Sequence, residues 1–263
     1  MAKTYARNYN WVIQATLMLF MISGAGVSFG SESEAMLKNS QQCLLVITGD
    51  WDAMEGTLFR FSRPSVEAEW RIENVSTPVV IGRNGLAWGR GLHPLSKRAQ
   101  QRMKEEGDGR APAGVFALTE AFGFAPKEEA GELSIPYRHV TEGLYCIDDA
   151  ESPFYNQLEQ LPPSQEAPWS SAEDMRAIVP DYEWGVVVAH NADPIVPKAG
   201  SCIFIHIWRG IDEGTAGCTA MPKEAMEELV HWLDASKHPV LVQLPGGEYD
   251  RYREEWQLPP LLP

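Results

Sequence analysis

Two residues in the C-terminal third of the chain have the types and the spacing for nucleophilic chemistry. Cys218 lies in a glycine-flanked turn, and His206 precedes it by twelve residues. A thiolate attacks carbonyl carbon, and an imidazole within hydrogen-bond distance takes the thiol proton and later gives it to the leaving amine. The pair therefore predicts acyl transfer through a thioester.

His206 alone also has a structural interpretation. In the expected strand Cys202–Trp208, alternation places His206 on an apolar face with Phe204, while three isoleucines lie on the opposite face. A lone imidazole on such a face is more often a hydrogen-bonded core residue than a catalyst. Cys218 is what favours the catalytic interpretation. Cys202 is a poorer nucleophile, because four residues of extended strand place it about 13 Å from His206.

The residues around Cys218 are suited to supporting it. Gly217 can adopt the backbone angles that a tight turn requires, and the helix expected at Pro222–Leu233 begins just beyond it. Amides near a helix N-terminus favour a thiolate and can face a developing oxyanion. The loop Arg209–Ala216 is long enough to reverse the chain, so that His206 and Cys218 can meet.

Around these residues the sequence resembles the L,D-transpeptidases of the YkuD-domain family. Their conserved box has a histidine followed by a Ser/Thr-x-Gly-Cys turn, as at His206 and Thr215–Cys218. The segment Lys104–Phe116 is similar to the family's GDG-x-(T/A)-P-x-G-x-F segment. Three more similar blocks are Gly82–Gly89, Asp148–Asn156 and Ser171–Met175. The resemblance runs from about Val79 to Leu244, which is most of the chain.

The resemblance implies a mostly β catalytic fold and attack on the bond between an L-centre and a D-centre of a peptidoglycan stem peptide. It implies that Cys218 is the nucleophile and His206 the general base. Thr215 stands in place of the usual serine, and Gly217 with the Cys218 amide would supply the turn and an oxyanion donor. The implied partners are donor and acceptor stem peptides, and no cofactor or metal is required.

Several positions depart from the family's pattern. Many members have a histidine directly before the glycine and an arginine two places after the cysteine, where this chain has Ala216 and Ala220. Trp208 and Arg209 replace the residues that commonly follow the histidine, and both are candidates to line a substrate cleft. Arg209 either binds a substrate carboxylate bidentately or is a surface arginine.

These departures leave the fate of the thioester open. An acceptor amine would make the protein a transpeptidase, whereas water would make it an L,D-carboxypeptidase or an amidase. A non-catalytic wall-binding protein is a third possibility, but such a protein has no need of both Cys218 and His206.

The first thirty residues predict export. Lys3 and Arg7, with no acidic residue, precede the apolar run Trp11–Val27. Polar residues and glycines within that run favour a signal peptide over a membrane-spanning helix. We expect cleavage near Gly30, with an uncleaved anchor as the alternative. Residues 31–263 would then form a single catalytic domain, a monomer in the periplasm or cell envelope.

Charge and cysteine content exclude several other classes. The formal net charge of −14 argues against a nucleic-acid partner, because phosphate binding needs clustered Lys and Arg. The six histidines show no His-x-x-x-His spacing, and no Cys-x-x-Cys occurs, so no zinc site is predicted. If Cys218 is a free thiol, at most one disulfide can form among Cys43, Cys146 and Cys202, and the sequence does not say which.

The pattern of apolar runs predicts a β-sandwich or barrel with a helix after the nucleophile and a few peripheral helices. Nine runs are expected to be strands: Cys43–Thr48, Gly56–Phe61, Val66–Ile72, Pro78–Gly82, Gly114–Leu118, Gly143–Ile147, Gly185–Ala189, Cys202–Trp208 and Pro239–Leu244. The apolar stripe and first-turn proline of Pro222–Leu233 predict a helix. Weaker helical signals lie at Ser96–Lys104, Pro153–Gln160 and Ser171–Ile178, and Leu161–Trp169 is expected to be a loop.

Overall fold

The computed structural model describes residues 37–73, 76–95, 102–162 and 164–261. The expected signal peptide, and most of the helix expected at Ser96–Lys104, lie outside these residues. Within the described part, no helix combines the length and the apolar character needed to cross a bilayer.

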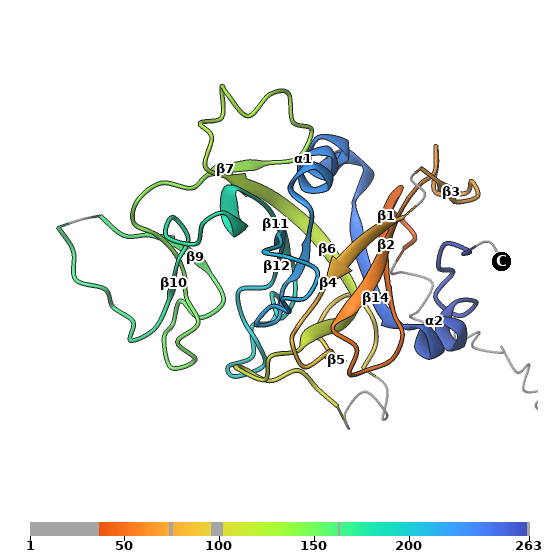
Figure 1. The fold of residues 1–263 in the computed structure, drawn as a ribbon, viewed down its shortest axis with the longest axis horizontal. Coiled ribbons are helices and arrows are strands. Elements are labelled where there is room, and N and C mark those ends of the chain that lie inside the picture. Colours follow the sequence, from red (N-terminus) through yellow and green to blue (C-terminus); the bar gives the residue numbers. More distant parts are fainter. Residues whose placement is uncertain (1–36, 74–75, 96–101, 163, 262–263) are drawn as a thin grey trace, which may run out of the picture. The chain divides into compact units, whose positions relative to one another are not determined.

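The protein is mostly β, as predicted (Figure 1). The strands of the described residues are β1 (Gln42–Thr48), β2 (Glu55–Ser62), β3 (Arg71–Ile72), β4 (Thr77–Val80), β5 (Leu86–Trp88), β6 (Ala111–Gly123), β7 (Tyr137–His139), β8 (Leu144–Cys146), β9 (Leu158–Gln160), β10 (Glu173–Asp174), β11 (Trp184–Val188), β12 (Phe204–Ile207), β13 (Thr219–Met221) and β14 (Val240–Pro245). The helices are α1 (Lys223–Trp232) and α2 (Gly246–Tyr252), with short 3₁₀ turns η3 (Asp181–Glu183) and η4 (Ala235–Lys237).

The main sheet closes on itself. Its strands are hydrogen-bonded in the order β1-β14-β6-β11-β12-β13-β4-β2, and β2 pairs with β1 along its length. β3 extends from β2, while β5 and β7 pair with β6. Closure leaves the strands of the ring without a free edge. Because β12 and β13 are hydrogen-bonded neighbours within this closed sheet, their ends are held in a defined position relative to each other.

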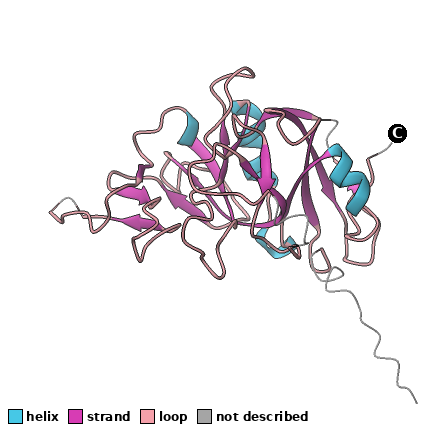
Figure 2. Cartoon of the chain, turned by 90° about the horizontal axis from the view of Figure 1, so that it is seen from below, coloured by secondary structure: helices cyan, strands magenta, loops and turns pink. Residues whose placement is uncertain are grey.

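A second, three-stranded sheet of order β10-β8-β9 carries the segment between β7 and β11. It lies to the left of the closed sheet in Figure 1 and again in Figure 2. The disulfide Cys146–Cys202 ties β8 to the segment that leads into β12. This bond identifies the pair that the sequence left open, and Cys43 and Cys218 are free thiols.

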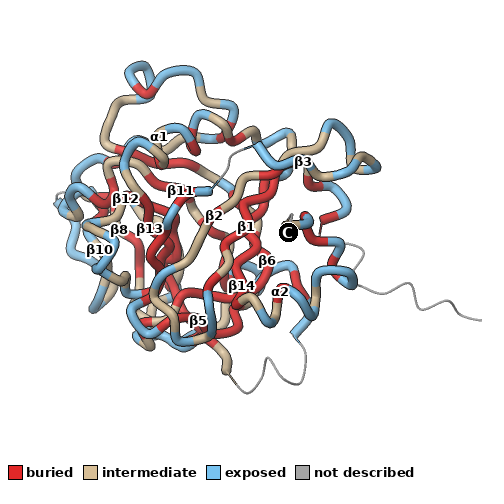
Figure 3. The backbone as a smooth tube through the Cα atoms, turned by 45° about the vertical axis from the view of Figure 1, so that its right-hand side comes forward, coloured by how far each residue is buried: buried red, intermediate tan, exposed pale blue. Residues whose placement is uncertain are grey.

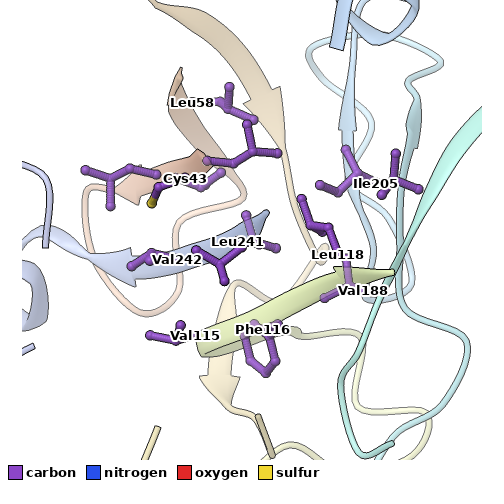
Figure 4. Packing of buried hydrophobic residues seen from close by; sticks show 14 of the residues in the cluster. Cys43, Leu58, Val115, Phe116, Leu118, Val188, Ile205, Leu241 and Val242 are labelled. Atoms are coloured by element: carbon purple, nitrogen blue, oxygen red, sulfur yellow. The ribbon is translucent and has the colours of Figure 1, made fainter. Parts of the chain in front are cut away.

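The interior of the closed sheet forms the main hydrophobic core (Figures 3 and 4). Ile203, Ile205 and Ile207 belong to this core. Phe204 faces the other way, into a smaller cluster with Cys202 and Cys218. The alternation predicted for this strand is confirmed, and it places His206 on the side of the small cluster.

Some sequence predictions differ from the structure. Helix α1 confirms the one firm helical prediction, Pro222–Leu233. Pro153–Gln160 is not helical, since turns lead into β9 there, and the side chains of Asp149 and Ser152 accept backbone N–H groups two residues ahead, which competes with a helix.

Two further segments were wrongly predicted. Ser171–Ile178 is not helical, because Glu173 pairs with Cys146 as part of the small sheet. Val66–Ile72 was predicted as a strand, but only its last two residues pair with β2. Helix α2 and the short strands β5, β7, β9, β10 and β13 gave no periodic signal of their own.

Candidate active site

His206 and Cys218 come from neighbouring parallel strands. β12 and β13 pair in the register His206 to Ala220, and Cys218 lies immediately before β13. The Phe204 amide donates a hydrogen bond to Cys218 Sγ over 3.3 Å. Both candidate catalytic side chains line one cavity of about 240 Å³. The structure therefore brings together the pair that the sequence singled out.

The His206 ring is held in one tautomer. Its Nδ1 lies 2.7 Å from the carbonyl oxygen of Ile207, which is an acceptor only. Nδ1 must therefore carry the hydrogen, so that Nε2 is the basic nitrogen. Burial lowers the pKa of His206 below its ordinary value, against the opposing effect of the Ile207 carbonyl. The ring is therefore a neutral base near pH 7.

The Cys218 thiol is buried and protonated at rest. It donates to the carbonyl oxygen of Cys202 over 3.4 Å, and in the described chain no hydrogen bond joins it to His206. Burial, reinforced by the negative charge of Glu173, raises the pKa of Cys218 to about 12. The Phe204 amide and Lys104 act in the opposite direction but are weaker. Desolvation therefore outweighs the two groups that favour the thiolate.

Thr215 organises the turn before the nucleophile. Its hydroxyl accepts from the Gly217 amide over 3.0 Å and donates to the Cys218 carbonyl over 2.7 Å. The Cys218 amide takes no part in these two bonds. Thr215 therefore fixes the direction of the turn, while the Cys218 amide remains a candidate oxyanion donor.

Gly217 is needed for space and not for a left-handed backbone. It is absent from the residues with positive φ. A Cβ atom there would lie 3.1 Å from the Arg110 carbonyl oxygen and 3.3 Å from Ile203 Cδ1, distances that few real Cβ atoms show. The close approach of the turn to the segment before β6 explains the glycine.

Trp208 and Arg209, the two candidates to line a substrate cleft, both line the first cavity. Arg209 Nε donates to both carboxylate oxygens of Asp181, at 3.0 and 3.1 Å. The guanidinium is therefore oriented by a protein carboxylate. Ala216 and Ala220, which depart from the family's pattern, line the same cavity and give it small, apolar side chains at these two positions.

A second cavity, of about 180 Å³, lies against the same nucleophile. Glu173, Ala216 and Cys218 line both cavities. Lys104 lines the second one and is buried, with its Nζ 2.8 Å from Asp108 Oδ1. Asp108 also accepts the amides of Glu105 and Arg110, which stabilises the turn between these residues.

Sequence reasoning missed Glu173, Tyr182 and Lys104 as site residues. The Tyr182 hydroxyl donates to Glu173 Oε2 over 2.7 Å, and its ring packs edge-on against His206 with centroids 5.4 Å apart. Burial raises the pKa of Glu173 to about 7. Glu173 and Lys104 do lie in the blocks Ser171–Met175 and Lys104–Phe116, so the resemblance marked these segments without giving the residues a role.

Comparison with known families agrees with this geometry. The sequence model of the YkuD family, described as the L,D-transpeptidase catalytic domain, matches residues 68–242, more than half of the 263-residue chain. The matched region includes every residue that lines the two cavities. No curated protein and no solved structure matched the chain. The chain therefore belongs to the YkuD family of L,D-transpeptidase catalytic domains, cysteine-dependent enzymes that act on peptidoglycan.

Proposed function

We propose that this chain is an exported L,D-transpeptidase that works in the periplasm or cell envelope on peptidoglycan stem peptides. The observation that carries the proposal is the pairing of a free thiol with an imidazole of fixed tautomer. Cys218 and His206 line the same cavity, and the Ile207 carbonyl leaves Nε2 of His206 as the base.

Acylation begins when the Cys218 thiol leaves the Cys202 carbonyl and turns toward His206. Nε2 takes the proton as the sulfur attacks the carbonyl of the L-centre residue in a donor tetrapeptide. The Cys218 amide donates to the oxyanion. Collapse of the tetrahedral intermediate passes the proton to the departing D-amino acid and leaves a thioester on Cys218.

The raised pKa of Cys218 decides the order of these events. With a pKa of about 12, the free enzyme holds almost no thiolate near pH 7. Proton transfer to His206 must accompany attack once substrate is bound, so the nucleophile is protected from oxidation while the cleft is empty.

An acceptor amine then resolves the thioester, and the acyl-bond energy is conserved without ATP. Water in place of the amine would give an L,D-carboxypeptidase or an amidase. A purely wall-binding role does not use the fixed tautomer of His206 or the free thiol, so those two features favour turnover.

The test is intact-mass measurement of the purified protein after exposure to a carbapenem. We expect one adduct on the wild type, none on Cys218→Ala, and the wild-type result on Cys43→Ala, which removes the other free thiol. Equal labelling of the Cys218→Ala variant, or no labelling of the wild type, would refute the assignment. Analysis of wall fragments then separates new cross-links from trimmed stems.

A further inference from the structure

One carboxylate lines both of the cavities that meet at the nucleophile. Among the described residues, Glu173 shares that position only with Cys218 and Ala216. In a two-step acyl transfer the D-amino acid departs from the acyl carbon and a second nucleophile then attacks that carbon, so space is needed beside Cys218 for both groups. Glu173 is thus placed to contact the nucleophile that resolves the thioester.

The Glu173 side chain is held firmly. Its backbone pairs with Cys146 in the small sheet, and the disulfide of Cys146 anchors that sheet beside the active site. The Tyr182 hydroxyl donates to Oε2 over 2.7 Å, and the Tyr182 ring packs against both Phe204 and His206. One carboxylate oxygen is fixed by Tyr182, and the other remains for a ligand.

The second cavity is built to receive hydrogen-bond donors. Asp148 lines it, and Asp148 Oδ1 is buried without a hydrogen-bond partner in the described chain. Leaving a buried carboxylate oxygen unpaired is unfavourable. Glu106, in the same cavity, already accepts the hydroxyls of Ser201 and Tyr155. Arg83 and Lys104 also line this cavity, but Lys104 is already paired with Asp108. An incoming group with several N–H donors therefore fits the remaining carboxylate oxygens.

Resting on the proposed function, we propose that Glu173 is the proton acceptor for a cationic primary amine that resolves the Cys218 thioester. The role makes Glu173 a determinant of acceptor class, selecting a protonated amine over water. Asp148 contributes by receiving a second N–H of the same ammonium group.

The proton count explains why a second base is needed. An ammonium group has no lone pair, so R–NH₃⁺ must first give one proton to the Glu173 carboxylate and become R–NH₂. The amine nitrogen then bonds to the thioester carbonyl carbon, and His206 Nε2 takes the second proton. The C–S bond breaks, the amide forms, and that proton returns to the Cys218 sulfur, while Glu173 releases the first proton to solvent and is ionised again. Water is neutral and needs only His206.

The charges around Glu173 set when it can accept a proton. The titratable and charged groups that face it or line its two cavities are Tyr182, Cys218, His206, Asp181, Arg209, Glu213, Asp148, Glu106, Lys104 and Arg83. Burial raises the pKa of Glu173 to about 7, with Asp148 and Glu106 adding to the rise and the Tyr182 hydrogen bond opposing it. Near neutral pH the carboxylate is therefore ionised in part and is a stronger base than an ordinary glutamate.

The experiment compares two amine acceptors with the Glu173→Gln variant. The donor is a synthetic stem tetrapeptide, and the acceptors are Nα-acetyl-lysinamide, whose amine has a pKa of about 10.4, and hydroxylamine, which is already neutral near pH 7. Because the charge of Glu173 also acts on Cys218, transfer to each acceptor is measured relative to hydrolysis of the same acyl-enzyme. We expect the ratio of Nα-acetyl-lysinamide transfer to hydrolysis to fall roughly 100-fold in Glu173→Gln, and the ratio of hydroxylamine transfer to hydrolysis to fall far less. Glu166→Gln, an exposed carboxylate of the same segment, is the matched control and should behave as wild type.

A pH profile separates a proton-transfer role from a structural one. In the wild type, transfer to Nα-acetyl-lysinamide should rise through pH 7 and then level off, because Glu173 supplies the base. In Glu173→Gln it should climb about tenfold per pH unit toward pH 10, as the free amine forms in solution. The wild-type profile is informative even if the variant does not fold.

Three results would overturn the inference: undiminished transfer to the lysine amine in Glu173→Gln, equal loss with both acceptors, or a wild-type profile that climbs to pH 10 without levelling. Failure of the wild type to form any acyl-enzyme would instead count against the proposed function, so the two proposals fail in different ways.

Discussion

Removal of the Cys146–Cys202 disulfide should destabilise the protein by a calculable amount. The bond joins residues 56 positions apart. In the chain-entropy description, closing a loop of that length in the unfolded state contributes about 4 kcal/mol at 25 °C.

The backbone at Cys202 reduces this gain. Its φ is 54°, a left-handed conformation that costs a non-glycine residue about 1 kcal/mol. A Cys146→Ser/Cys202→Ser double variant can relax that strain, so we expect a net loss of roughly 3 kcal/mol in the free energy of unfolding.

Urea unfolding of the oxidised wild type and the double variant measures this difference. With an m-value near 3 kcal/mol/M, the midpoint should shift by about 1 M. Dithiothreitol should lower the urea midpoint of the wild type by a similar amount. The midpoint of a Cys43→Ala control, which keeps the disulfide, should fall equally, and that of the double variant should not change. A loss below about 1 kcal/mol at constant m-value would show that the small sheet is held by its packing and not by the covalent bond.

Three further outcomes follow from the structure. Thr215→Val removes both hydrogen bonds of the turn and should slow carbapenem acylation about tenfold in stopped-flow measurements. Thr215→Ser should stay close to the wild-type rate. A Thr215→Val rate equal to that of the wild type would exclude a role for the hydroxyl. Tyr182→Phe removes the hydrogen bond that lowers the pKa of Glu173, so the pH at which amine transfer levels off should move upward, and an unmoved profile would contradict the contact. Burial lowers the pKa of His93 to about 4, so the unfolded state binds more protons below pH 6.5 and stability falls as the pH drops. In His93→Gln the free energy of unfolding should fall less steeply with decreasing pH, by about 1.4 kcal/mol per pH unit between pH 6.5 and 4. Urea titrations at several pH values measure this slope, and an unchanged slope would refute the buried neutral imidazole.

The features that follow from local chemistry were predictable from the sequence. The isoleucines of β12 alternate with Phe204 and His206 because a strand has period two, and α1 has a clear apolar stripe. The turn at Cys218 was evident from its glycine and threonine, although Gly217 is required by a neighbouring carbonyl and not by its own backbone angles.

The features that depend on long-range contacts were not predictable. Glu173 lies in a two-residue strand that exists only because β8 pairs with it, so Ser171–Ile178 was wrongly expected to be a helix. The disulfide joins two of three equally apolar cysteines, and only tertiary placement distinguishes Cys43 from the pair. The protonated state of Cys218 likewise depends on burial by segments distant in sequence.

The parallel pairing of β12 with β13 has a consequence for how such an enzyme can diversify. Neighbouring strands in a sheet are held about 4.8 Å apart, so the spacing between the His206 and Cys218 backbones is a property of the closed sheet. The connecting residues 209–214 contribute to the cleft wall without setting that spacing. Insertions or exchanges in this connection can therefore alter which peptidoglycan substrate is bound while the chemical pair stays in place, so that substrate choice and bond chemistry can evolve separately.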